Sequence, residues 1–259
     1  MSETKTTSGK PRKATRKAAA TTAAKAPAKA ARKASPKAAP AARDTAKRDP
    51  AKTRANILKA ATAEFSAKGY SGARTEQIAK RAKSNIRMLY HYFGGKDALY
   101  TCVLEEVIGQ LRVHELQLDF SHVDPVDGIV QMFDFIDGHF AAHPELRNLL
   151  AFENLGRAAH LKRSTRIPQM SSPVLALIGA LLQRGEATGV VRPGIDPLHL
   201  YVAIASLAYY AKSHAYTLSR IFQQDMLTPA WQWAHTAQTR RMLLAYLAPD
   251  RTNTPETTT

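Results

Sequence analysis

Four polar side chains that suit DNA recognition lie close together in one short segment. They are Asn85, Arg87, Tyr90 and His91. The amide of asparagine pairs well with adenine, and the guanidinium of arginine pairs with guanine or with a phosphate. The segment from Ile86 to about Tyr92 is predicted to be helical, so its first turn would carry these groups to the edges of bases.

Two residues outside this helix suit contacts with the phosphate backbone. Thr75 is predicted as the N-cap of a short helix over 76–81, and the amides that follow it can hold a phosphate. Lys96 is expected at the start of a longer helix, where it can reach the phosphate backbone of the DNA. A short helix, a tight turn and a second short helix with polar residues near its start describe a helix-turn-helix. The alternative is a surface helical hairpin whose charges are merely solvated.

The helix-turn-helix needs a supporting helix and defined ends. Apolar residues at steps of three and four predict a helix over about 52–68, and Gly69 is expected to stop it. Asn85 is predicted to cap the second short helix, and the glycines at 94–95 are predicted to end it.

Prolines mark the helices in the rest of the chain, because a proline directly after a potential capping residue is a good signal for a helix start. Such pairs are Asp124-Pro125, His143-Pro144, Ser172-Pro173 (as a start or a kink), Asp196-Pro197 and Thr228-Pro229. No stretch alternates strictly between polar and apolar residues over the length of a strand. The sequence therefore predicts an all-α body of about nine helices.

Composition divides the chain of 259 residues into parts. Residues 1–50 hold 14 Lys and Arg against three acidic residues, with 16 Ala and no aromatic, Ile, Leu or Val. A segment without large apolar groups cannot offset the entropy lost on ordering, so a disordered basic arm is expected. After it we expect a DNA-binding domain over 51–97, a ligand-binding and dimerisation domain over 98–249 and a disordered tail over 250–259.

The remaining composition excludes several classes of protein. The net charge of +16 points to a polyanionic partner, of which nucleic acid is the usual one. The single cysteine, Cys102, excludes a disulfide framework and a cysteine-based zinc site. No apolar run approaches the roughly 20 residues of a membrane span, and the N-terminus lacks the apolar core of a secretory signal. We therefore expect a cytoplasmic, nucleoid-associated protein.

The segment 54–99 resembles the TetR family of bacterial transcriptional regulators. The resemblance is carried by Arg54-x2-Ile57-Leu58-x-Ala60-Ala61-x3-Phe65-x3-Gly69-Tyr70, Thr75-x-Gln77-Ile78-Ala79-x2-Ala82 and Asn85-x3-Leu89-Tyr90-x-Tyr92-Phe93-Gly94-Gly95-Lys96-Asp97-Ala98-Leu99. Two departures are visible: Lys83-Ser84 stands where the turn usually has Gly-Val, and Ile86-Arg87-Met88 replaces a small, polar triplet. The operator therefore cannot be taken from a relative.

The resemblance implies a homodimer that reads a palindrome in double-stranded DNA as a repressor. Its larger C-terminal domain would bind a small molecule and release the DNA. The family's DNA contacts carry over to Thr75, Asn85, Arg87, Met88, Tyr90, His91 and Lys96. Among these, Tyr90 and Lys96 would mostly hold phosphates.

A cavity for the small molecule is expected among the middle helices, with apolar walls and a few polar groups. The candidate residues are Met132, Phe133, Ile136, His139, Phe140, Phe152, Asn154, Arg157, Tyr209 and His214. For each of them a plain core or surface position is the competing interpretation. Glu153 and Arg157, which are four residues apart, can simply pair with each other.

The apolar segment 198–216 must be covered on two sides, which indicates a dimer interface. Small residues that would let a partner helix approach are Ala203, Ala205, Ser206 and Ala208. The last helix would complete a four-helix interface with Trp231, Trp233, Met242, Leu243 and Tyr246. The alternative is that 198–216 is the central helix of a monomer.

The sequence gives little support to catalysis, a metal or a cofactor. His139 and His143 are spaced to share a metal ion, but no third ligand is dictated. There is no glycine-rich phosphate loop and no serine-centred nucleophile elbow. Cys102 lies among apolar residues, as expected of an inert thiol. Two functions remain: a ligand-responsive transcriptional regulator, and an architectural, nucleoid-type DNA-binding protein dominated by its basic arm.

Overall fold

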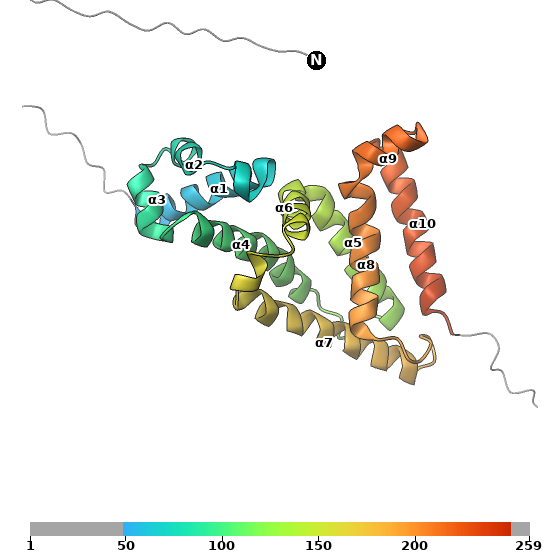
Figure 1. The fold of residues 1–259 in the computed structure, drawn as a ribbon. Helices are drawn as coiled ribbons and strands as arrows, with labels where there is room; N and C mark the ends of the chain where they lie inside the picture. The colour runs from blue at the N-terminus through green and yellow to red at the C-terminus, as the bar shows by residue number, and fades with distance from the viewer. Residues whose placement is uncertain (1–48, 250–259) are drawn as a thin grey trace, which may run out of the picture. The chain divides into compact units, whose positions relative to one another are not determined.

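A computed structural model describes residues 49–249 of the chain. The predicted basic arm lies outside the described residues except for its last two positions, and the tail over 250–259 lies outside them entirely. Within 49–249 every regular element is helical, as predicted, with ten α-helices and one 3₁₀ turn (Figure 1). None of the helices in this range is long and apolar enough to cross a membrane.

The helices follow one another with short connections. They are α1 (Pro50–Gly72), α2 (Thr75–Arg81), α3 (Ile86–Phe93), α4 (Lys96–Leu116), α5 (Pro125–Ala142), α6 (Pro144–Leu155), the 3₁₀ turn η1 (Leu161–Arg163), α7 (Arg166–Ala187), α8 (Pro197–Ser213), α9 (Ala215–Phe222) and α10 (Pro229–Leu247). The boundary expected between 97 and 98 falls inside the first turn of α4, so one continuous helix belongs to both expected domains.

Four of the five predicted proline starts are confirmed, at Pro125, Pro144, Pro197 and Pro229. His143 makes no capping bond with its side chain, and α1 also begins at a proline, Pro50, about two residues before the predicted start. The side chains of Asp49, Asp124, Asp196 and Thr228 each accept a hydrogen bond from a backbone amide in the first turn of the helix that follows. Such caps satisfy amides that have no partner inside the helix. Each of these four residues is followed by a proline at the first helical position.

Ser172-Pro173 was expected to start or to kink a helix, and the start is wrong, because α7 already begins at Arg166 and Pro173 lies inside it. The physical reason is Ser164, whose hydroxyl oxygen accepts hydrogen bonds from the amides of Arg166 and Ile167 at 3.2 and 3.3 Å. The kink stays a prediction. The predicted helix over 198–216 also ends early, at Ser213, and α9 is a separate helix after it. This break accounts for ten helices where about nine were predicted.

Gly69 interrupts α1 without ending it. Its φ of 67° lies in the left-handed region, and the helix continues to Gly72 across the resulting kink. A Cβ at this position would lie 2.9 Å from the ring of Phe152 on α6. Glycine is therefore needed here for its backbone conformation and for the close approach of α6.

The buried residues form one connected core. In the N-terminal part, Ile57, Phe65 and Leu89 are fully buried and hold α1 and α3 together with the start of α4. In the C-terminal part, α5, α8 and α10 lie side by side (Figure 1), with Phe133 and Ile204 fully buried between them. Helix α3 is thus positioned by the N-terminal part of this core.

Candidate nucleic-acid interface

Helix α3 has a buried side and an exposed side. Leu89 and Phe93, four residues apart, are buried against α1 and α4. The predicted DNA-contacting residues Asn85, Arg87, Tyr90 and His91 are all exposed. The structure therefore brings these four side chains to one short helix and leaves them accessible to a ligand.

Asn85 is the N-cap of α3, as predicted. Its Oδ1 accepts a hydrogen bond from the amide of Arg87 at 2.9 Å. A bidentate pair with adenine would need this oxygen as well as the amide nitrogen. The capping bond therefore favours a base contact through Nδ2, and it fixes the backbone from which the Arg87 side chain leaves.

Thr75 does not cap α2. The helix begins at Thr75 itself, and Arg74 precedes it without a side-chain capping bond. The Thr75 side chain is largely buried, with 7% of the residue exposed. Its assignment as a DNA contact stays a prediction, and its two direct neighbours, Arg74 and Glu76, are both exposed.

Lys96 is the first residue of α4, the helix that follows α3 in the chain. Its Nζ lies 4.7 Å from the centre of the Tyr70 ring, in a cation–π arrangement. The Tyr70 hydroxyl donates a hydrogen bond to Asp97, which also pairs with Arg163 at 2.9 Å. These two partners lower the pKa of Asp97, and Asp97 in turn raises the pKa of Tyr70. The N-terminus of α4 is thereby fixed to α1, with a cation held at the surface.

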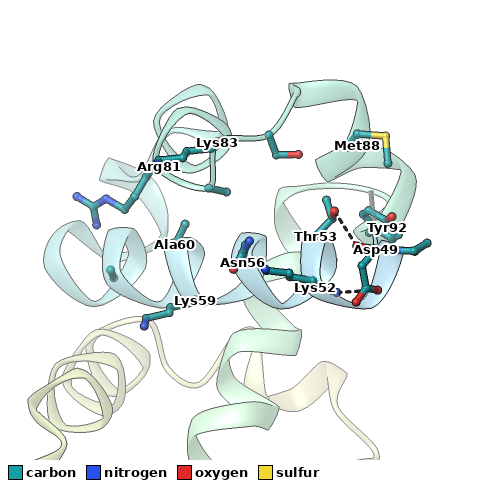
Figure 2. A pocket seen from close by; sticks show the side chains of 14 residues that line it. Asp49, Lys52, Thr53, Asn56, Lys59, Ala60, Arg81, Lys83, Met88 and Tyr92 are labelled. Atoms are coloured by element: carbon teal, nitrogen blue, oxygen red, sulfur yellow. Dashed lines mark hydrogen bonds between the residues drawn. The ribbon is translucent and has the colours of Figure 1, made fainter. Parts of the chain in front are cut away.

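A groove beside α3 was not predicted from the sequence. It has a volume of about 880 Å³ and lies between the first half of α1, the end of α2 and the turn before α3 (Figure 2). Its cations are Lys52, Lys59, Arg81 and Lys83, and we call it the basic groove. Met88, one of the predicted contacts, and Tyr92 line it from α3. The seven-residue spacing of Lys52 and Lys59 on α1 was a usable signal, because residues seven apart share one face of a helix.

Charge is distributed unevenly between the two expected domains. Residues 51–97 contain ten basic and three acidic residues, whereas 98–249 contain 12 basic and 13 acidic residues. The excess positive charge that follows the arm therefore lies entirely in the helix-turn-helix part. Such an excess attracts a polyanion to that part of the chain.

The predicted ligand-binding residues do not all lie together. Phe133, Ile136, His139 and Phe140 are buried on α5, and the ring centres of Phe140 and Tyr209 of α8 are 5.4 Å apart. Asn154, Arg157 and His214 are exposed. Phe152 packs on Gly69 of α1. The cavities around α1, α4, α6 and α7 are lined by other residues, so the effector site stays a prediction.

The suggested pairing of Glu153 with Arg157 is wrong. Glu153 is buried and accepts hydrogen bonds from the amides of His160 and Leu161 at 3.1 and 3.0 Å, and its Oε1 lies 3.0 Å from Nδ1 of His160. Arg157 has a φ of 55°, which turns the chain back toward α6. Burial and the Glu153 carboxylate also raise the pKa of Tyr100, which lies against the His160 ring.

Three histidines meet near the ends of α4 and α5. The ring centre of His139 lies 4.2 Å from that of His143 and 6.3 Å from that of His114. Burial, with smaller contributions from these two rings, lowers the pKa of His139 to about 4. Within residues 49–249, however, no group of three or more His, Cys, Asp or Glu side chains is placed to hold a metal ion.

Exposed apolar side chains collect on the last three helices. They include Leu198, Val202, Tyr210, Tyr216, Phe222, Trp233, Met242 and Tyr246. Exposed apolar patches of this kind mark interaction surfaces. Ala208, which was expected to face a partner, is fully buried in the chain's own core, whereas Ala203 and Ser206 are exposed.

Comparison with family models supports the resemblance seen in the sequence. The model described as bacterial regulatory proteins of the tetR family matches residues 57–102. The model described as a tetracyclin repressor-like C-terminal domain matches residues 125–243. Together they cover the helix-turn-helix and the helices α5 to α10.

Individual relatives agree with these matches. The HTH-type transcriptional repressor NicS of Pseudomonas putida is 37% identical over 175 residues, which are 68% of this chain and 82% of NicS. The HTH-type transcriptional repressor SCO4008 of Streptomyces coelicolor is 35% identical over 164 residues, covering 63% of this chain and 81% of that protein. The HTH-type transcriptional regulator RutR of Escherichia coli is 31% identical over 161 residues, covering 60% of this chain and 72% of RutR.

Solved structures share the fold. A putative transcriptional regulator, SCO4942 of Streptomyces coelicolor, aligns with a TM-score of 0.57 at 26% identity over 73% of this chain and 97% of that one. A putative tetR family regulator from Shewanella aligns with a TM-score of 0.55 at 17% identity over 76% of this chain and 98% of that one.

Proposed function

Because the chain belongs to the TetR family of DNA-binding transcriptional regulators, we propose that it is a repressor that leaves a palindromic operator when its C-terminal domain binds a small molecule. The observation that carries the proposal is the exposed face of α3. It combines a capped N-terminus with Arg87, Tyr90 and His91 free to meet DNA. The protein would act in the cytoplasm, at the nucleoid.

Each predicted contact has a role in this proposal. Arg87 reads a base, because its guanidinium can pair with two acceptors of guanine in the major groove. Lys96, held over Tyr70, contacts a phosphate and sets the position of the helix without reading sequence. Asn85 caps α3 and adds a contact through its amide nitrogen.

A homodimer gives two such helices to the two halves of a palindrome. The exposed apolar residues of α8 and α10 supply the interface, with Val202 and Met242 each about half-exposed in the single chain. Two copies of α8 and α10 would form a four-helix interface. The effector would act on the helices between this interface and α4.

Selection of bound duplexes from a random library tests the proposal. A specific repressor prefers one palindrome over random duplex by a factor of about a thousand or more. Addition of cell metabolites in fractions should then identify the one that releases the selected DNA. Enrichment of no sequence would overturn the proposal and favour the competing function, an architectural DNA-binding protein that depends on its 14 basic arm residues.

A further inference from the structure

The basic groove carries cations on both of its walls. Lys52 and Lys59 belong to α1, whereas Arg81 ends α2 and Lys83 lies in the turn before α3 (Figure 2). In the described part of the chain, the ammonium groups of the three lysines have no ion-pair or hydrogen-bond partner. Arg81 pairs with Glu64 at 3.9 Å, and its side chain stays half-exposed. The charges of the three lysines are therefore available to a ligand.

The acidic residue of the groove does not offset these cations at close range. Asp49 points its Oδ1 at the backbone of α1, where it accepts hydrogen bonds from the amides of Ala51 and Lys52 at 2.9 and 3.3 Å. The rest of the lining is polar or apolar, and Ala60, Ala63 and Ala82 contribute only methyl groups. Small side chains leave the volume of the groove open to a chain-like anion.

Lys83 is held in an unfavourable backbone conformation. Its φ of 50° lies in the left-handed region, where a residue with a Cβ is strained and glycine is not. A glycine would fit the turn better than this lysine does. The backbone of the turn therefore does not explain why this position is a lysine. The positive charge that Lys83 adds to the groove does explain it.

The groove is continuous with the reading helix. Met88 and Tyr92 line it from α3, and they directly follow the exposed residues Arg87 and His91 in the chain. When a helix enters the major groove, the phosphates of the duplex run past the elements beside it. Asp49 and Pro50 also line the groove, so the 14 basic residues of the arm directly precede it in the sequence.

We propose that the basic groove binds the sugar-phosphate backbone of the DNA that flanks the base pairs read by α3. The inference rests on the proposed function and extends the contacted DNA beyond the half-site. The groove recognises phosphodiester charge and not sequence, because lysines on flexible stems act as point charges toward phosphates. It would stabilise binding to operator and to random duplex to similar degrees.

The test uses the full chain, a labelled 40-base-pair duplex of random sequence and the operator obtained by selection. In the variant Lys52→Gln/Lys59→Gln, the plot of log affinity against log salt should be shallower by about two on both duplexes. The reason is that each phosphate contact contributes about 0.9 to the steepness of this plot. Lys162→Gln, an exposed change in η1, is the control and should leave the slope unchanged.

Two further variants separate charge from folding. Asn56→Asp adds a negative charge to the groove with almost no change of shape, and it should weaken both duplexes several-fold, whereas Asn148→Asp on α6 should not. Lys83→Gly should unfold at an equal or higher urea concentration and yet bind DNA more weakly. A variant that folds at least as well and binds worse cannot be explained by damage to the fold.

Several results would overturn the inference. One is a salt slope for Lys52→Gln/Lys59→Gln equal to that of Lys162→Gln. Another is a changed preferred sequence, which would mean that the groove reads bases. A third is an effect confined to binding of inorganic pyrophosphate or ATP, which would make the groove a site for small phosphates. If Arg87→Ala still alters base preference while these variants fail, the proposed function stands without the groove.

Discussion

The imidazole ring of His160 lies 4.2 Å from the ring of Tyr70, which joins the segment after α6 to the end of α1. The same imidazole meets Tyr100 of α4 edge-on at 4.7 Å, and its Nδ1 lies 3.0 Å from the buried carboxylate of Glu153. One side chain thus contacts α1, α4 and α6. Through Tyr70 and Asp97, the contact extends to the start of α4, where Lys96 faces the DNA in our proposal.

His160→Ala should therefore destabilise the chain and weaken DNA binding together. Removal of the imidazole leaves the buried Glu153 carboxylate with one partner fewer, which costs about 1–3 kcal/mol. Urea unfolding of the variant measures this loss, and binding to the selected operator measures the second effect. The control is His122→Ala, an exposed residue on the connection before α5. Equal stability of the two variants would show that the His160 contacts contribute nothing.

Arg87 and Lys96 should differ in what they do to specificity. Arg87→Ala should relax base preference at one position of each half-site, at a cost of about 1–3 kcal/mol there. Lys96→Ala should weaken all duplexes about equally, because a phosphate contact carries no sequence information. Competition binding with single-base variants of the operator distinguishes the two. A uniform loss for Arg87→Ala, with an unchanged preference profile, would contradict the base-contact assignment.

Dimerisation should depend on the exposed apolar face of α8. Val202→Glu would place a charge in a dry interface, so the full chain should become monomeric and lose affinity for the palindrome. Val113→Glu is a matched control on α4, since Val113 is 54% exposed and Val202 is 52% exposed. Sedimentation equilibrium reports the mass of each variant. A wild-type chain that is monomeric and still binds the full palindrome tightly would refute the dimer.

Local signals made the helices predictable. A proline after a capping Asp or Thr starts four of them, of which the three after Asp124, Asp196 and Thr228 were predicted, because the amides at a helix N-terminus need acceptors and the capping side chain supplies one. The start of α7 was not predicted because Ser164, whose hydroxyl accepts from the amides of Arg166 and Ile167, is not directly followed by a proline as the capping residues of the other starts are. Exposure of Arg87 and burial of Leu89 follow from the helical period alone.

The contacts between distant segments could not be predicted in this way. Nothing in the spacing of Glu153, Arg157 and His160 shows that the chain turns back at Arg157 and brings His160 to the carboxylate. The basic groove likewise depends on how the turn at Lys83 packs beside α1. Small residues in 198–216 indicated a close approach of helices, but only the fold shows that Ala208 faces its own core. Tertiary packing decides each of these cases.

His139 should make the fold sensitive to acid. Its pKa is about 4 in the folded chain against 6.5 for an ordinary histidine, because burial and the neighbouring His143 and His114 disfavour the charged ring, while Glu145 opposes them. The unfolded chain therefore binds more protons below pH 6.5. Stability should fall as the pH drops from 6.5 toward 4, by at most about 1.4 kcal/mol per pH unit.

The variant His139→Gln should reduce this pH dependence. Urea unfolding at pH 7.5, 6 and 5 gives the slope for wild type and variant, and His122→Gln serves as the exposed control. The change of unfolding free energy with pH in the wild type, minus the same change in the variant, is the part attributed to His139. If that difference is zero across the range, the buried imidazole does not control acid stability.

Deletion of the basic arm should reduce the salt dependence of DNA binding far more than its specificity. The truncation should remove residues 1–48 and keep Asp49, because Asp49 caps α1 and loss of such a cap costs about 1 kcal/mol. Each phosphate that the arm neutralises adds about 0.9 to the slope of log affinity against log salt. If half of its 14 Lys and Arg engage, the slope should flatten by about six.

The preferred operator should stay the same after this deletion, because the helix that carries Asn85 and Arg87 is intact. Titrations of operator and random duplexes across salt concentrations, with the full chain and with residues 49–259, provide both readouts. An unchanged slope would show that the arm does not contact DNA. A changed preferred sequence would show instead that the arm reads bases, as an arm lying in the minor groove can do.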